Sequence, residues 1–236
     1  MAKPTLGVIT FPGSNCDDDA VHVAGSILGC KTVRLWHKDH DLQGSDLVIL
    51  PGGFSYGDYL RTGAIARFAP ILEEVRAFAG KGGPVLGICN GFQILCEAGL
   101  LPGVLIRNAG LKFVCKHIHI KRKSSSSPWT AGVPDGKALR IPVAHGEGNY
   151  FGPPDLIRRL QDEDRVAFAY CDEQGRESAE SNPNGSLANI AGILNEKKNV
   201  LGMMPHPERA SEAALGSEDG RAILEGGLAF VNGMIS

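Results

Sequence analysis

The residues best suited to chemistry surround Cys89, in the segment Gly87-Ile88-Cys89-Asn90-Gly91. An apolar stretch, 84–88, precedes the cysteine and an amphipathic stretch follows it, which is the context of a nucleophile elbow with sulfur in place of oxygen. The glycines permit a tight turn, and the free N–H groups of a following helix favour a thiolate there. The pattern therefore indicates a nucleophilic cysteine. The alternative is an inert, buried cysteine that ends a parallel strand.

A base for this nucleophile is expected at His206, in the segment Met204-Pro205-His206-Pro207-Glu208-Arg209 at the end of a predicted strand. Open α/β sheets carry their sites at that end of the strands. Two prolines hold the segment extended, so His206 and Glu208 can lie on one side of it. Glu208 would then accept a hydrogen bond from the imidazole and fix its tautomer. Taken alone, the segment could be a rigid turn with an exposed ion pair, but its pairing with the elbow favours a catalytic triad.

An oxyanion site is expected at Leu50-Pro51-Gly52-Gly53-Phe54, which ends another predicted strand. The N–H groups of Gly52 and Gly53 could point at a developing oxyanion, with the N–H of Asn90 as a further donor. Gln93 comes one helical turn after the nucleophile and is expected to line the pocket. By itself Pro-Gly-Gly is an ordinary turn sequence. With the triad it indicates acyl transfer.

The remaining candidate ligands predict neither a disulfide framework nor a metal site. The six cysteines are scattered and include no C-x-x-C pair. Cys16 precedes three aspartates, which disfavour a thiolate, so we expect a structural role for it. His117 and His119 alternate along a predicted strand, and two histidines without a third ligand make a poor metal site.

The elements that must position these residues follow from hydrophobic periodicity. The first half of the chain alternates predicted strands with predicted helices, which is typical of a parallel sheet covered by helices. Its strands are expected at 6–10, 32–36, 46–50 and 84–88, and its helices at 17–28, 63–79 and 91–98. Strand-like segments follow at 112–121, 138–144, 166–170 and 187–194, in an order that the pattern leaves open, before a strand at 200–204 and a helix at 218–234. We predict one α/β domain over residues 1–236, with a mostly parallel open sheet flanked by helices.

Composition narrows the classes of partner. The formal net charge is −2, so nothing draws the chain to nucleic acid or an anionic membrane surface. It has neither an apolar run of the roughly 20 residues that cross a bilayer nor a signal peptide at its start, and a cytosolic location is expected. A G-x-x-x-x-G-K-[ST] loop is also missing, so no ATP site is legible.

Taken together, these motifs resemble the class I, or triad, glutamine amidotransferases. The resemblance covers nearly the whole chain and implies a flavodoxin-like fold with Cys89, His206 and Glu208 as the triad. Four segments are further similar to the members of this class that serve purine biosynthesis. They are Phe11–Asp17, Pro51–Asp58, Ala144–Gly148 and Met204–Arg209.

The resemblance implies that glutamine is hydrolysed through a cysteine thioester to glutamate and ammonia. It also implies contacts of glutamine with Asn108 and Phe113. No cofactor is expected in this chain, because ATP and Mg²⁺ would be used by a large synthase subunit that receives the ammonia. A small accessory subunit is implied as a further partner.

Three alternatives remain at this point. The elbow and triad specify acyl transfer but not glutamine, so the chain could be another triad amidotransferase or a cysteine hydrolase of another amide. A non-catalytic regulatory subunit could also keep the fold. Such subunits usually lose a triad member, whereas Cys89, His206 and Glu208 are all present.

Overall fold

The computed structural model describes residues 3–58 and 62–235, and within them nine strands form one mixed sheet. The order across the sheet is β2-β1-β3-β4-β11-β10-β9-β6-β7. The strands are β1 (Thr5–Thr10), β2 (Lys31–Trp36), β3 (Leu47–Leu50), β4 (Val85–Ile88), β6 (Val114–Arg122), β7 (Ala138–His145), β9 (Val166–Cys171), β10 (Ile190–Leu194) and β11 (Val200–Met203). A separate antiparallel pair joins β5 (Val104–Ile106) to β8 (Asn149–Phe151).

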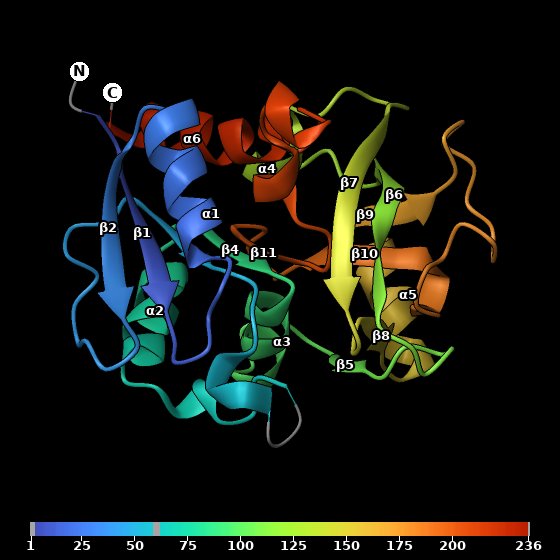
Figure 1. The fold of residues 1–236 in the computed structure, drawn as a ribbon, viewed down its shortest axis with the longest axis horizontal. Helices are drawn as coiled ribbons and strands as arrows, with labels where there is room; N and C mark the ends of the chain where they lie inside the picture. The colour runs from blue at the N-terminus through green and yellow to red at the C-terminus, as the bar shows by residue number, and fades with distance from the viewer. Residues whose placement is uncertain (1–2, 59–61, 236) are drawn as a thin grey trace.

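The first five strands of this order, β2 to β11, all run parallel; we call them the parallel half. All residues of β3, β4 and β11 are buried, as expected for central strands covered on both faces. Figure 1 shows α1 (Asp17–His22) and α6 (Arg221–Ile235) on one side, and α2 (Ile71–Gly80) and α3 (Asn90–Glu97) on the other. The predicted α/β fold, with helices flanking a parallel sheet, is confirmed.

The other four strands, β10, β9, β6 and β7, pair antiparallel; we call them the antiparallel half. This half joins the parallel half through the antiparallel pairing of β10 with β11. Helix α5 (Pro154–Asp162) lies beside it at the right of Figure 1, and the short α4 (Pro128–Ala131) packs on α6. The order of these strands, which the hydrophobic pattern left open, is set by tertiary packing.

Several predicted boundaries are wrong, and each has a local cause. The helix expected over 63–79 begins only at Ile71, because Pro70 is its N-cap and Gly63 has a φ of 82°. Before it the chain forms a short 3₁₀ turn, Ala66–Phe68. The strand expected from residue 187 begins at Ile190, after another 3₁₀ turn. Helix α5 was not predicted.

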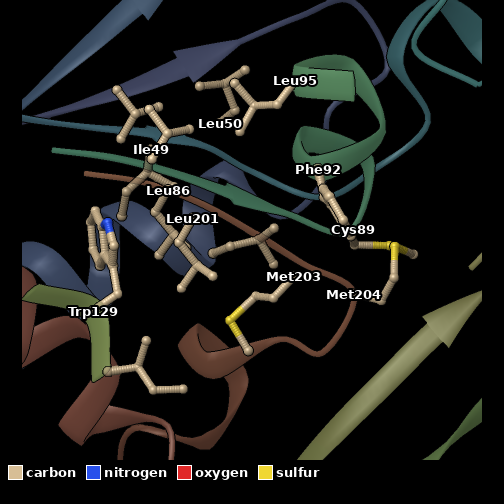
Figure 2. Close-up of a cluster of buried hydrophobic side chains, with 14 of the residues drawn as sticks. Ile49, Leu50, Leu86, Cys89, Phe92, Leu95, Trp129, Leu201, Met203 and Met204 are labelled. Carbon is tan, nitrogen blue, oxygen red and sulfur yellow. The ribbon is translucent and has the colours of Figure 1, made fainter. Parts of the chain in front are cut away.

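The hydrophobic core runs through both halves of the sheet, and its part in the parallel half lies next to Cys89. Figure 2 shows side chains of the three central strands, among them Leu50, Leu86 and Leu201, between α3 and the Trp129 ring of α4. Phe92 and Leu95 extend this core from α3 and are almost fully buried. Cys89 belongs to this buried cluster and lies beside Phe92, so the predicted nucleophile is attached to a packed part of the core. In the part of the chain that the structure describes, no helix has both the length and the apolar character needed to span a bilayer.

Candidate active site

Cys89 occupies a strained turn between β4 and α3. Its φ of 51° and ψ of −103° lie in a region that non-glycine residues rarely adopt, at a cost of about 1–3 kcal/mol. The turn closes because two glycines let backbones touch. A Cβ at Gly91 would lie 1.9 Å from the Leu50 carbonyl oxygen, and one at Gly87 would lie 2.8 Å from the Gly91 carbonyl. The predicted elbow geometry is therefore present, with the cysteine directly before a helix N-terminus.

His206 and Glu208 form a buried hydrogen-bonded pair after β11. The imidazole Nδ1 lies 2.6 Å from Glu208 Oε1, and the side chains are 2% and 1% exposed. The backbone N–H of His206 donates to the carbonyl of Pro142 in β7, at 2.9 Å. Among the described residues, the second ring nitrogen, Nε2, has no hydrogen-bond partner. A base held at one nitrogen and free at the other can transfer protons.

The surroundings of His206 favour its charged form. Burial by itself would lower the pKa of His206, but the negative charge of Glu208, with a smaller contribution from the neighbouring Cys89, outweighs it. The net result is a pKa well above the ordinary value of 6.5 for histidine. A charged imidazolium next to Cys89 can donate a proton to a leaving group, which is the role predicted for His206.

Gly52 lies where the side chains of His206, Cys16 and Cys89 come closest to the backbone. A Cβ at this position would lie 2.7 Å from Cε1 of His206, 3.1 Å from Sγ of Cys16 and 3.5 Å from Cβ of Cys89. Only glycine leaves room for the three side chains. The predicted oxyanion loop is thus next to Cys89 and His206. Its Gly53 has a φ of 135° and packs against the backbone of Ser14 and Asn15.

Cys16 lies at the site, where sequence reasoning had not placed it. It is buried, it precedes α1, and its sulfur accepts a hydrogen bond from Nη2 of Arg209 at 3.2 Å. Arg209 also donates through Nε to Asp19, at 2.9 Å. The motif that supplies His206 and Glu208 therefore also binds the start of α1. The aspartates after Cys16 suggested only a helix start, and no local signal revealed the tertiary contact.

A cavity of about 150 Å³ opens beside Cys89. It is smaller than the roughly 300–1,000 Å³ typical of pockets for drug-sized ligands, and it suits a molecule the size of one amino acid. Gly53, Gln93 and Phe113, all predicted site residues, line it. Larger hollows of about 500 and 660 Å³ lie elsewhere on the described part of the chain, but neither has a cysteine or histidine in its lining.

Two predicted polar residues brace the cavity from α3. The Asn90 amide donates to Oε1 of Gln93 at 3.1 Å, and its oxygen accepts from the N–H of Ser55. Gln93 in turn donates to the carbonyl of Glu147 at 2.6 Å. The N–H of Asn90 belongs to the first turn of α3, where helical N–H groups lack an intrahelical acceptor. Its predicted use as an oxyanion donor stays a prediction.

The end of β7 and the loop after it, residues 145–148, form the opposite wall of the cavity, and the sequence alone did not assign them a step in the reaction. Asn108 holds this loop: its Oδ1 accepts from the N–H of Gly148 at 2.9 Å, and its Nδ2 donates to the carbonyl of His145 at 2.9 Å. Both ends of the Asn108 amide are thus occupied by protein groups, and the side chain is 1% exposed. The predicted contact of Asn108 with glutamine stays a prediction, and in the structure its side chain braces the loop.

His145 completes a buried polar network behind this wall. Its Nδ1 lies 3.2 Å from Oδ1 of Asn108, and its Nε2 lies 3.4 Å from the amide nitrogen of Asn184. Burial, aided by the charge of nearby His206, lowers the pKa of His145 to about 4. His145 is therefore neutral at pH 7, with Nδ1–H donating to Asn108 and Nε2 accepting from Asn184. The glycines of this segment were its only sequence signal.

A family model and curated relatives both match this chain to glutamine amidotransferases. Residues 3–222 match the model of the CobB/CobQ-like glutamine amidotransferase domain. The chain is 58% identical over 225 residues to phosphoribosylformylglycinamidine synthase subunit PurQ of Chlorobium chlorochromatii, covering 95% of this chain and 96% of that one. It is also 58% identical to the subunit of the same name from Chlorobaculum tepidum, over 99% of this chain and 100% of the relative.

Solved structures agree with this family. A chain in the structure of PurLQS from Thermotoga maritima superposes with a TM-score of 0.86 at 41% identity, covering 97% of this chain and 99% of that one. A putative GMP synthase subunit from Thermoplasma acidophilum superposes with a TM-score of 0.63 at 15% identity, over 99% of this chain and 96% of that one, which shows a shared fold.

Proposed function

This chain belongs to the CobB/CobQ-like glutamine amidotransferase family, and from that membership we propose that it is the glutaminase subunit of a phosphoribosylformylglycinamidine synthase. It serves purine biosynthesis, as do the relatives that it matches along almost their entire length. The observation that carries the proposal is the strained Cys89 beside the buried His206–Glu208 pair at the wall of a small cavity.

Attack on glutamine is the first step. The Cys89 thiolate adds to the carbon of the side-chain amide, and the carbonyl oxygen becomes an oxyanion. The N–H groups of Gly52, Gly53 and Asn90 are the proposed donors to it. A single donor of this kind is typically worth about 2.7–4 kcal/mol in the transition state.

His206 then transfers the protons, first as an acid and later as a base. The imidazolium gives its Nε2 proton to the departing nitrogen, ammonia leaves, and a γ-glutamyl thioester remains on Cys89. The neutral imidazole next takes a proton from water as that water attacks the thioester. Glutamate leaves, and the thiolate–imidazolium pair is restored. Glu208 stabilises the imidazolium in both steps through the bond to Nδ1.

The ammonia is consumed by a partner. The similar chain from Thermotoga maritima belongs to a structure described as PurLQS, which supports assembly with a large synthase subunit and a small accessory subunit. In the proposed reaction the synthase uses ATP and Mg²⁺ to activate the amide oxygen of formylglycinamide ribonucleotide. Nitrogen replaces that oxygen, giving the amidine. This chain itself needs no cofactor in the scheme, and a cytosolic location is part of the proposal.

The test is release of glutamate from glutamine by the purified chain, alone and with both partner subunits. Cys89→Ala should abolish release, whereas Cys115→Ala, which alters an exposed cysteine of β6, should retain it. Enhancement by the partners is expected from coupled amidotransfer. Full activity in Cys89→Ala, or no glutamate even from the complete assembly, would contradict the proposal and favour a non-catalytic subunit. Hydrolysis of other amides in preference to glutamine would favour the alternative hydrolase.

A further inference from the structure

Glu147 is a charged residue of the cavity wall to which the proposed reaction gives no role. It lines the cavity together with Cys89, and its side chain is 28% exposed. Among the described residues that line the cavity, Glu147 alone carries a carboxylate. A bound molecule therefore meets a negative charge at this point of the wall.

Protein groups fix the position of this carboxylate. The hydroxyl of Thr62 donates to Oε2 of Glu147 at 2.9 Å, and Nε2 of Gln93 donates to its backbone carbonyl at 2.6 Å. Arg107 pairs with it only loosely, because its Nε lies 3.9 Å from Oε1 and its side chain is 79% exposed. In the described part of the chain, a neutral hydroxyl and a distant guanidinium thus hold the carboxylate and leave it able to bind a cation.

We propose that Glu147 binds the α-ammonium group of glutamine and thereby selects a free amino acid as the substrate. This inference rests on the proposed glutaminase function. Glutamine has its reacting amide at one end and an ammonium group at the other, and hydrogen bonds between an ammonium and a carboxylate are among the strong ones in proteins. Glu147 binds the end of the substrate that does not react, so its contact determines specificity and takes no part in bond breaking.

The dimensions of the site allow one molecule to touch both groups. In extended glutamine the α-nitrogen lies about 5 Å from the amide carbon, since each C–C bond is about 1.5 Å long. The cavity is small, about 150 Å³, and has both Cys89 and Glu147 in its wall. The Cys89 sulfur also lies 3.7 Å from the carbonyl of Ala144, three residues before Glu147. The amide carbon can therefore reach the sulfur while the ammonium reaches the carboxylate.

The alternative is that Glu147 only braces the 145–148 loop, as Asn108 does. In that case its loss would affect every amide substrate by the same factor. Glutaramate separates the two roles, because it keeps the amide, the carbon chain and the carboxylate of glutamine but has hydrogen in place of the ammonium group. A residue that binds the ammonium contributes to the hydrolysis of glutamine and not to that of glutaramate.

The experiment compares the two substrates in the complete assembly, by the release of glutamate from glutamine and of glutarate from glutaramate. Glu147→Gln should lower kcat/KM for glutamine about 10–100-fold, chiefly by raising KM, because a hydrogen bond to a charged group is lost. Its kcat/KM for glutaramate should change less than about threefold, since no such bond exists there. Glu173→Gln is the matched control, in an exposed residue of the turn after β9, and should keep the wild-type preference.

Equal losses with the two substrates would assign Glu147 to bracing and overturn the proposal, as would an unchanged kcat/KM for glutamine. Should glutaramate bind without being hydrolysed, its inhibition constant against glutamine replaces kcat/KM in the comparison. Thermal melts verify folding, and if Glu147→Gln does not fold, Glu147→Asp takes its place and should reduce the preference for glutamine by a smaller factor. Absence of glutamate from the wild-type assembly would contradict the glutaminase function itself, whereas release with an unchanged preference in the variant contradicts only the role of Glu147.

Discussion

The two halves of the sheet contribute differently to the site. The parallel half presents every atom proposed to react: Cys89 follows β4, Gly52 follows β3, and His206 follows β11. The antiparallel half supplies the wall, because the loop after β7 faces Cys89 across the cavity. The halves meet where the Cys89 sulfur lies 3.7 Å from the carbonyl of Ala144. Parallel strands place reactive groups at one edge, and the antiparallel extension encloses them.

The difference between the halves has a physical origin. In the parallel half, strand ends meet because all the strands point the same way, so loops far apart in sequence converge without further help. In the antiparallel half, neighbouring strand ends point in opposite directions. Its wall is therefore held by side-chain hydrogen bonds, chiefly those of Asn108, His145 and Asn184. We expect substitutions in the parallel half to act on the rate, and those in the antiparallel half to act on binding and stability.

The largest expected effect on rate is that of Glu208→Gln. The imidazolium loses its charge partner at Nδ1, and kcat for glutamate release should fall about 10⁴-fold, as it does when the acid of a serine-protease triad is neutralised. Glu212→Gln serves as the control, because Glu212 lies on the next turn and pairs with the exposed His22. Its kcat should be close to that of the wild type. A loss of less than tenfold in Glu208→Gln would remove Glu208 from the triad.

Gly52→Ala should have the next largest effect. The added methyl group would lie 2.7 Å from the His206 ring, so the imidazole must shift, and a displacement of about 1 Å can cost 10²-fold in rate. Gly80→Ala adds a methyl group where nothing lies within 4 Å and serves as the control. Comparison of kcat for the two variants, with thermal melts to verify folding, measures this. Unchanged kcat in Gly52→Ala would argue against tight convergence at this residue.

Asn108→Ala tests the antiparallel half. It leaves buried groups of His145 and Gly148 unpaired, at about 1–3 kcal/mol each, so the free energy of unfolding should fall and KM for glutamine should rise several-fold, with a smaller change in kcat. Asn195→Ala removes a bracing amide far from the cavity, so it should lower stability without raising KM. A fall in kcat as large as that of Glu208→Gln would break the proposed division between the halves.

The smallest expected effect concerns pH and stability. The pKa of His145 falls from 6.5 to about 4 on folding, so the unfolded chain takes up a proton below about pH 6.5 that the folded chain refuses. Wild-type stability should therefore decline between pH 6.5 and pH 4 by about 3 kcal/mol more than that of His145→Gln. Urea unfolding at several pH values measures the difference, with exposed His40→Gln as the control. If the free energy of unfolding depended on pH in the same way for the wild type and His145→Gln, the lowered pKa of His145 would be contradicted.

The sequence by itself determined the parallel half and the chemistry attached to it. Alternating apolar and amphipathic stretches predicted β1, β3 and β4 to within one residue, because such periodicity reports burial directly. The elbow glycines, the Pro-Gly-Gly turn and the His-Pro-Glu segment indicated acyl transfer because each motif requires a local backbone shape. The structure places all three at one edge of the sheet.

Tertiary structure alone decided the rest. The order of β10, β9, β6 and β7 depends on pairing between distant segments, which periodicity does not encode. The hydrogen bonds of the Asn108 amide to the 145–148 segment could not be read from the sequence, and its predicted contact with glutamine stays a prediction. Cys16 looked structural from its acidic neighbours, yet packing brings it to His206. Local patterns specify what a backbone segment can do, whereas the environment of a buried side chain is set by residues that only the fold brings near.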